Sequence, residues 1–540
     1  MKNIFKAINF FMIITVIGFS ITGCINSFYD LNLRHPDVVA FKNQLNALVG
    51  GTNKFEPITV KLAPLTFSTA NSVQSNIVNW GAINETVKNA QKYVILDLSD
   101  CTVEGNILYG KSDLNPMYFD CRNAMNVIAE NQYIKGIILP ATLKTVGAAF
   151  WGCIHLTSVS ISAGVTSIDE LAFWDCTGLT EILTDDANSR YASDNGILFN
   201  KDKTILEKYP LGKSGESYTI PFHVTSLGNR AFANNSRLTD IVIPNNVISI
   251  GNEVFSGCSN LENITISNSV TSIGDWAFGG CSSWKNISIP NSVTSIGYGA
   301  FAGCSNLESI TIPNTLTSID GSFVGCSNLK NVTIPNSVTS IGDSAFSECS
   351  SLENISIPNS VTSIGDWAFS GCSNLVSIIV DPENSFYESE NGILFNQDKT
   401  TLIWYSPKKT ETSYTIPNTV TSIEYEAFSD CKTLTNITIP DSVTSIGRAA
   451  FRNCSKLSRI TIPKSVTSIG YQAFWNCPNL TSVSFKGSNT ELEYDSFDYV
   501  SGYTSLENIY KNMRGGAGNY TKTAEGNWKK VEQQFKEDQV

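Results

Sequence analysis

Histidine is scarce in this chain of 540 residues: only His35, His155 and His223 occur, and they stand in unrelated sequence contexts. The chain also lacks a His-Glu-x-x-His metal motif, a Walker loop and a nucleophile elbow. Serine is plentiful, but it recurs within a Ser-Val-Thr-Ser segment, which is typical of a strand surface rather than of a nucleophile. The sequence therefore predicts neither an enzyme nor a cofactor or metal site.

Charged residues are also few, at 16% of the chain, and acidic residues exceed basic ones by 49 to 37. The formal net charge is −12. Proteins bind nucleic acids largely through Lys and Arg side chains that displace counterions from the phosphates. This acidic balance therefore predicts that nucleic acid is not a partner.

A nearly continuous apolar run covers residues 7–21 and follows two lysines. Because about 20 apolar residues are needed to span a bilayer, the run favours a signal peptide. Ile21-Thr22-Gly23-Cys24 resembles the bacterial lipobox, in which the signal is cut before the Cys and the thiol carries a diacylglycerol. We predict a lipoprotein signal peptide at residues 1–23 and lipid attachment at Cys24; an ordinary secretory signal is the alternative.

Cysteines mark an internal repeat. An Ala-Phe-x-x-Cys segment recurs, and Cys258, Cys281 and Cys304 are spaced 23 residues apart. Eleven cysteines take this slot, and Asn235 takes it once: Cys153, Cys176, Cys258, Cys281, Cys304, Cys326, Cys349, Cys372, Cys431, Cys454 and Cys477. One such unit is too short to bury its own apolar positions, so about 15 units are expected to stack as the coils of a solenoid.

One unit shows the expected structure of a coil. Ile310 and Ile312 alternate with a polar residue after Leu307, which predicts a short strand with one buried face. Pro313 should end the strand, because it has no N–H to donate to a ladder. Residues 316–319 alternate again and predict a second short strand, and the Ala-Phe pair of each unit should point inward.

The run Ile-x-Ile-Pro-Asn-Ser-Val-Thr-Ser-Ile-Gly-x-x-Ala-Phe-x-x-Cys-x-x-Leu, as at residues 287–307, resembles the BspA-type leucine-rich repeats of bacterial surface proteins. The resemblance covers roughly residues 131–485. It implies a right-handed leucine-rich-repeat solenoid, mainly β, with short strands joined by turns or 3-10 segments. It also implies host matrix proteins or other bacteria as binding targets.

Two copies of one insert interrupt the array, near residues 184–217 and 380–413. Ile197-Leu198-Phe199 and Thr204-Ile205-Leu206 flank a turn and predict a hairpin; the inserts are either projecting coils or binding loops. Residues 24–130 are expected to anchor the chain and cap the open core, with a helix from Ala40 to Leu48 and a first strand from Tyr93 to Ser99. Residues 486–540 should form a C-terminal cap and a tail, with a flexible joint at the glycine run 515–518.

The repeated cysteines allow three interpretations. Neighbouring coils bring them close, so disulfides are conceivable in an extracytoplasmic protein. The substitution by Asn235 favours instead a ladder of small buried side chains that hydrogen-bond to the backbone. A metal role has the least support, because no C-x-x-C pair accompanies the ladder. Cys101 and Cys121 stand outside the ladder and are the better disulfide candidates.

Small polar residues flank the buried position of each strand and should face outward in parallel ladders. These are Asn263, Thr265, Asn286, Ser288, Ser309, Thr311, Asn331, Thr333, Asn354, Ser356, Asn436 and Thr438. They offer many modest hydrogen bonds to a large partner, or they are merely solvated. Trp276 and Trp367, both in Gly-Asp-Trp-Ala-Phe, either stack on sugars or pack on the outside of a coil.

These features together predict a lipid-anchored extracytoplasmic protein at the cell surface or outer membrane. It would act as an adhesin or interaction scaffold that binds extracellular proteins of a host or of neighbouring bacteria. A structural protein of the envelope and a carbohydrate-binding protein are the alternatives.

Overall fold

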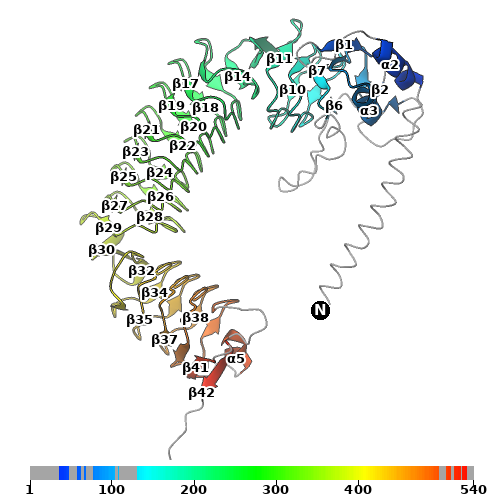
Figure 1. The fold of residues 1–540 in the computed structure, drawn as a ribbon. Helices are drawn as coiled ribbons and strands as arrows, with labels where there is room; N and C mark the ends of the chain where they lie inside the picture. Colours follow the sequence, from blue (N-terminus) through cyan, green and yellow to red (C-terminus); the bar gives the residue numbers. More distant parts are fainter. Residues whose placement is uncertain are drawn as a thin grey trace, which may run out of the picture. The chain divides into compact units, whose positions relative to one another are not determined.

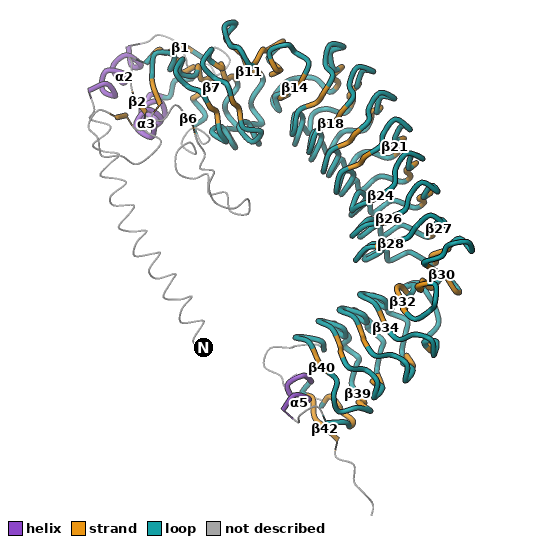
Figure 2. Tube along the Cα trace, turned by 180° about the vertical axis from the view of Figure 1, so that it is seen from behind, coloured by secondary structure: helices purple, strands orange, loops and turns teal. Residues whose placement is uncertain are grey.

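The computed structural model describes residues 36–47, 57–62, 66–67, 77–78, 80–103, 107–108, 131–497, 506–512, 516–523 and 526–531. Over these residues the chain is a mostly-β solenoid of about 16 turns with few helices (Figures 1 and 2), which confirms the predicted fold class. It divides into two compact units, Met1–Glu216 with Pro221–Arg237 and Ser217–Ile220 with Leu238–Val540. Cys24, Cys121 and the predicted signal peptide lie outside the described residues.

Short parallel strands make up most of the first unit. One sheet pairs β1, β4, β7, β9 and β11 in that order, a second pairs β10, β8 and β6, and a third pairs β3, β2 and β5. The strands are β1 Ile58–Lys61, β2 Thr66–Phe67, β3 Ile77–Val78, β4 Val94–Asp97, β5 Thr102–Val103, β6 Ile107–Leu108, β7 Ile134–Ile138, β8 Thr145–Val146, β9 Ser158–Ile161, β10 Ser167–Ile168 and β11 Glu181–Thr184.

Two helices, α2 (Pro36–Ala47) and α3 (Trp80–Ala90), close the N-terminal end of this core (Figure 1). The side chains of Phe41 and Leu45 on α2 and of Ile83 on α3 are buried in the same apolar cluster as β4. The predicted helix is present as α2. The predicted first strand exists as β4, but β1 precedes it and pairs with it in parallel, so it is not the first.

The second unit alternates strands of three or four residues with strands of two residues along the chain. In Figure 1 the longer strands follow one side of the coils and the two-residue strands the other. The longer strands are β15 Ser217–Thr219, β17 Asp240–Val242, β19 Asn263–Thr265, β21 Asn286–Ser288, β23 Ser309–Thr311, β25 Asn331–Thr333, β27 Asn354–Ile357, β29 Ser377–Val380, β33 Ser413–Thr415, β35 Asn436–Thr438, β37 Arg459–Ile462 and β39 Ser482–Phe485. The two-residue strands are β18 Ser249–Ile250, β20 Ser272–Ile273, β22 Ser295–Ile296, β24 Ser318–Ile319, β26 Ser340–Ile341, β28 Ser363–Ile364, β34 Ser422–Ile423, β36 Ser445–Ile446, β38 Ser468–Ile469 and β40 Glu491–Leu492.

The interior of each coil agrees with the repeat pattern. Leu307, Ile310 and Ile312 are at most 5% exposed, and β23 ends two residues before Pro313. The ring of Phe301 is fully buried and stacks on the rings of the neighbouring coils, with centroids 5.5 and 5.7 Å away. The connections are turns, one of the two kinds expected, and no 3-10 helix occurs in the part of the chain that the structure describes.

Each insert is an antiparallel three-stranded ribbon. In the first, β12 (Tyr191–Asp194) pairs with β13 (Ile197–Asn200), which pairs with β14 (Ile205–Lys208); β14 then pairs in parallel with β16 (Ser226–Leu227). The second repeats this with β30 (Tyr387–Glu390), β31 (Ile393–Asn396) and β32 (Thr401–Trp404). The predicted hairpin is β13–β14, and β12 is an additional strand.

The C-terminal residues of the second unit pack on the last coils of that unit. Helix α5 (Leu506–Asn512) and strands β41 (Gly518–Lys522) and β42 (Trp528–Val531) add to β39, and Tyr510 and Tyr520 are buried against Phe485. The glycine run is not a joint where it is described, because Gly518 begins β41 and the carbonyl oxygen of Gly516 accepts a hydrogen bond from the Tyr520 hydroxyl at 2.8 Å.

Candidate binding surface and cleft

The twelve predicted outward residues, here called the polar face, are all exposed. Eight of them lie in register on β21, β23, β25 and β27 of one parallel sheet. They form one column of Asn286, Ser309, Asn331 and Asn354 and another of Ser288, Thr311, Thr333 and Ser356. The predicted ladders therefore exist in this part of the chain.

The other four members are not on that sheet. Asn263 and Thr265 belong to the sheet of β15, β17 and β19, and Asn436 and Thr438 belong to the pair β33–β35 beyond the second insert. The second column also continues into Ile379 on β29, which is 53% exposed. The continuous part of the polar face is thus four strands wide, and it ends beside an exposed apolar side chain.

Side chains of the polar face bond to one another along the ladder. The Ser309 hydroxyl donates to Asn286 Oδ1 at 3.0 Å, and the hydroxyl of Ser377, on β29 beside the polar face, donates to Asn354 Oδ1 at 2.8 Å. Tight protein interfaces depend on a few buried Trp, Tyr or Arg anchors, which these columns do not supply. The polar face is suited to broad contact made of many weak hydrogen bonds.

The repeated cysteines are buried thiols. Cys281, Cys304 and Cys326 each donate from Sγ to a Phe carbonyl oxygen in an adjacent coil, with a sulfur–oxygen distance of 3.2 Å. Burial raises the pKa of Cys304 to about 12, so the thiol is a poor nucleophile near neutral pH. The thiol interpretation is confirmed and the disulfide interpretation of the ladder is wrong.

The cysteines were also considered as metal ligands and, for Cys101 and Cys121, as a disulfide pair. Among the described residues, no group of three or more His, Cys, Asp and Glu side chains could hold a metal ion. Cys101 is buried. Because Cys121 lies outside the described residues, the disulfide between them stays a prediction.

The structure distinguishes the two tryptophans that share one motif. Trp276 lies over Gly299 of the next coil, where a Cβ atom would come within 2.7 Å of the indole. This agrees with packing on the outside of a coil. Trp367 precedes the second insert instead, and its ring meets the ring of Tyr425 edge-on, with centroids 5.1 Å apart.

Trp367 lines a cleft of about 310 Å³, here called the insert cleft. Ring stacking in the core runs from Phe255 to Phe369 and resumes at Tyr405 after the insert. The cleft lies at this interruption, with the aromatic side chains of Trp367, Trp404 and Tyr425 and four carboxylates in its lining.

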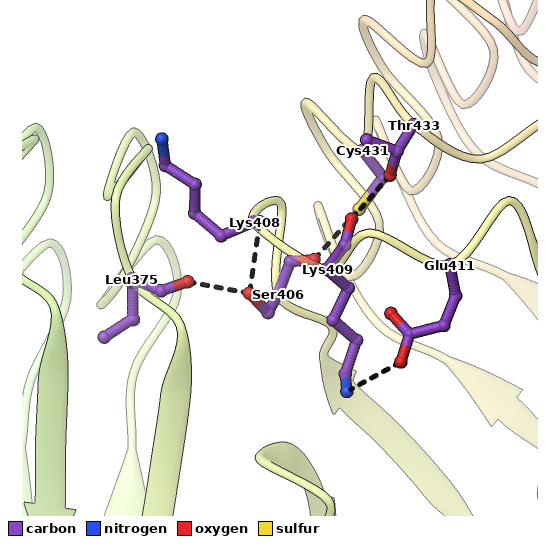
Figure 3. A network of polar contacts seen from close by, with 7 residues as sticks. All are labelled: Leu375, Ser406, Lys408, Lys409, Glu411, Cys431 and Thr433. Carbon is purple, nitrogen blue, oxygen red and sulfur yellow. Dashed lines mark hydrogen bonds and ion pairs between the residues drawn. The ribbon is translucent and has the colours of Figure 1, made fainter.

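A buried serine, Ser406, forms hydrogen bonds with the coils on both sides of the second insert (Figure 3). The Ser406 hydroxyl donates to the Leu375 carbonyl oxygen at 2.7 Å, and the Cys431 thiol lies 3.9 Å from the Ser406 carbonyl oxygen. Ser406 thus joins the last coil before the insert to the first coil after it.

The first insert has a smaller counterpart, about 180 Å³, at the equivalent place. Each of its residues corresponds to the one 196 positions later, as Tyr191 does to Tyr387. Both tyrosine hydroxyls accept a hydrogen bond from a backbone N–H of the preceding two-residue strand, at 3.0 and 2.9 Å. The duplicated backbone is conserved between the copies, whereas the lining differs.

A model of the BspA type leucine-rich repeat region matches residues 125–196, 209–322, 314–409 and 403–513. The chain belongs to this BspA-type family. No curated protein matches this BspA-type chain. No helix among the described residues has the length and apolar character required to cross a membrane.

Solved structures with a similar fold are bacterial leucine-rich-repeat proteins. A leucine-rich cell surface protein from Faecalibacterium prausnitzii is 31% identical, with a TM-score of 0.46, covering 55% of this chain and 95% of that one. A leucine-rich-repeat protein from Bacteroides ovatus is 24% identical, with a TM-score of 0.35, covering 71% and 89%. The pneumococcal vaccine antigen PcpA is 21% identical, with a TM-score of 0.41, covering 60% and 96%.

The insert cleft of this BspA-type chain was not predicted. Its lining comes from segments up to 66 residues apart, from Ile364 to Asp430, and repeat spacing does not show that they meet. The sequence did contain one signal for the cleft. Aligning the two copies with each other shows the positions at which they differ in charge, such as Arg230 in the first copy and Glu426 in the second.

Proposed function

We propose that this BspA-type chain is a lipid-anchored protein of the cell surface whose polar face binds extracellular proteins of a host or of neighbouring bacteria. Lipid attachment at Cys24 would hold it to the membrane and leave the solenoid free to contact partners. We propose no catalytic role, because neither the sequence nor the described residues offer a set of catalytic side chains.

One observation supports the proposal most directly. The eight in-register side chains on β21, β23, β25 and β27 present an exposed sheet of small, uncharged donors and acceptors. Ser, Thr and Asn lose little conformational entropy when they are ordered in an interface. Many copies on one cell would add avidity to weak single contacts.

A pair of arginine substitutions tests the polar face. In the mature chain, residues 24–540, Ser309→Arg with Asn354→Arg places bulky cations two strands apart, about 10 Å, on the exposed sheet. Binding to immobilised host matrix proteins or bacterial surface fractions should weaken at least about tenfold, a change of 1.4 kcal/mol. Ser295→Arg with Ser363→Arg, on exposed residues of β22 and β28, is the control of equal charge.

The control defines what would contradict the proposal. Equal loss of binding in both double variants would show that added charge, not the polar face, is responsible. Binding to none of the matrix or bacterial fractions would favour a structural role in the envelope. Protease treatment of intact cells separates these cases further, because complete resistance of the chain would exclude display at the surface.

A further inference from the structure

The insert cleft is rich in carboxylates. Asp366, Glu424, Glu426 and Asp430 contribute to its lining, and none of the described residues that line it is Lys, Arg or His. Three cations lie nearby without lining it: Lys432 is 3.0 Å from Asp430, Arg452 is 3.6 Å from Glu426, and Arg448 lies over the Tyr425 ring. Asp366 and Glu424 are exposed at its margin. The field inside the cleft therefore favours a positively charged group.

Glu426 is the buried member of this group, with a side chain only 9% exposed. Its Oε1 atom accepts from the Tyr425 hydroxyl at 3.3 Å and faces Arg452. Its Oε2 atom is buried and has no hydrogen-bond partner in the protein, and the same holds for the Nε atom of the facing Arg452. An unsatisfied buried carboxylate oxygen is costly, so Oε2 is an acceptor that one further donor would stabilise.

The first insert shows which kind of donor fits. At the position of Glu426 it carries Arg230, whose guanidinium lies 2.6 Å from Glu170, the counterpart of Asp366. The same guanidinium lies over the Trp174 ring at 5.8 Å. The first copy thus places its own arginine against an acid and an aromatic ring. The second copy has Glu426 in place of Arg230 and Ser370 in place of Trp174, so its aromatic side chains come from other positions of the cleft.

The aromatic lining of the insert cleft matches the same ligand chemistry. A guanidinium is planar, stacks on aromatic faces and pairs with a carboxylate through two N–H groups. One coil further on, Arg448 lies 5.7 Å from the Tyr425 ring and 5.0 Å from the Tyr471 ring. The surface beside the cleft therefore already holds a guanidinium between two rings. The volume of about 310 Å³ is at the small end of ligand pockets, which favours one side chain over a larger ligand.

We infer that the insert cleft binds the guanidinium of an arginine side chain that a partner protein presents. The inference rests on the proposed role as a protein-binding scaffold and gives that scaffold an anchor of the kind the polar face lacks. Glu426 would accept from the guanidinium through Oε2, and Trp367 and Trp404 would contact its faces and its methylene stem. A partner would thus contribute the group that Arg230 contributes within the first copy.

Fluorine NMR of the mature chain labelled with 5-fluorotryptophan tests this site. The chain contains nine Trp, and single substitutions assign the signals of Trp276, Trp367 and Trp404. The probe is the blocked peptide Gly-Arg-Gly, with Gly-citrulline-Gly as its neutral isostere. The arginine peptide should shift the signals of Trp367 and Trp404 in a saturable way, leave that of Trp276 unchanged, and bind at least about tenfold more tightly than the citrulline peptide.

Two variants at one position sharpen the test. Glu426→Gln keeps the shape and an acceptor oxygen but removes the charge, and it should weaken the arginine peptide about tenfold. Glu426→Arg restores the residue of the first insert, fills the cleft from within, and should abolish the shifts while the melting curve remains cooperative. Trp276→Gly, which removes an exposed ring elsewhere, should leave binding unchanged.

Several results would overturn the inference. Equal shifts with the citrulline peptide would show that charge is not recognised, and shifts with neutral monosaccharides but not with arginine would identify a sugar site. Unaltered arginine binding by Glu426→Arg would place the peptide elsewhere. The two proposals can fail separately. If the Ser309→Arg, Asn354→Arg variant loses matrix binding but the signals of Trp367 and Trp404 do not respond to the arginine peptide, only the inference about the cleft is wrong. If these signals respond but the variant binds matrix normally, only the role of the polar face is wrong.

Discussion

Each coil from residue 230 to residue 477, the second insert aside, contains two residues in the left-handed backbone region, one two positions before the buried Phe and one just before the Cys or Asn of the ladder. Glycine takes the second position in many coils, as Gly303, Gly325 and Gly371 do, with φ near 71°. Glu348 takes it in the coil between Gly325 and Gly371, with φ of 60°. A residue with a Cβ atom is strained by roughly 1–2 kcal/mol in this region. These positions are therefore where single substitutions should raise stability.

Glu348→Gly should increase the free energy of unfolding by up to about 1 kcal/mol, because relief of the strained φ exceeds the added chain entropy. Glu348 is exposed, so little packing is lost. Urea denaturation measures the change. Glu353→Gly is the matched control, since Glu353 is exposed without a positive φ, and it should destabilise. Equal destabilisation by both substitutions would show that position 348 carries no strain.

Replacement of Phe301 tests how the interior of a coil is packed. Its fully buried ring stacks between Phe278 and Phe323, so Phe301→Ala leaves a cavity between two coils. The expected loss is about 3–5 kcal/mol in the free energy of unfolding. Denaturant melts of the purified chain measure it. A loss below about 1 kcal/mol would contradict the burial of this ring.

At the scale of the element, the sequence predicts what depends on near neighbours. The alternation around Ile310 and the proline after Ile312 placed β23 correctly, because a short strand needs only its period of two and a residue that ends it. The same pattern, repeated, predicted the buried ladder and the exposed columns. The insert cleft was missed because it depends on contacts between coils, and alternation within one segment carries no information about these. Strand β12 was missed for another reason: its hairpin with β13 is local, but residues 191–194 carry no run of apolar residues to mark a strand.

The buried thiols of the Cys ladder should make the stability of the fold depend on pH. Burial raises the pKa of Cys304 and of Cys349 from 9.0 to about 12. A folded-state pKa above the unfolded one means that the folded state holds its proton longer. The stabilisation is complete below pH 9 and is lost as the pH rises toward 12, by up to about 1.4 kcal/mol per pH unit for each such thiol.

Urea denaturation of this chain at pH 7, 8.5 and 10 should show stability that is flat to about pH 8.5 and then falls. Cys304→Ala removes one buried thiol and should make the fall less steep, although it lowers stability at pH 7. A thiol reagent at pH 8 should modify the ladder only after unfolding. A stability that rises between pH 8.5 and 10, or rapid modification of the folded chain, would contradict buried protonated thiols.

For the whole molecule, the property that matters most for adhesion is the predicted attachment of the chain to the membrane. The apolar run of residues 7–21 is shorter than a membrane span, so the predicted lipid on Cys24 is the feature that would retain a mature chain at the membrane. A chain with two or more acyl groups is held stably, where one acyl group alone gives only marginal binding. Avidity also depends on this, because weak contacts through the polar face add up only among copies held on one surface.

Cys24→Ala should therefore move the chain from the membrane fraction to the soluble fraction of lysed cells, and immunoblots of the two fractions measure this. Cys304→Ala, which removes a buried thiol and leaves Cys24 intact, should remain with the membrane and controls for general effects of losing a cysteine. Cells that express the Cys24→Ala chain should also adhere less to matrix coats even though the released chain keeps its polar face, because single copies lack avidity. Retention of the Cys24→Ala chain in the membrane fraction would refute lipid anchoring and would leave binding by the solenoid itself to be judged by the polar-face variants alone.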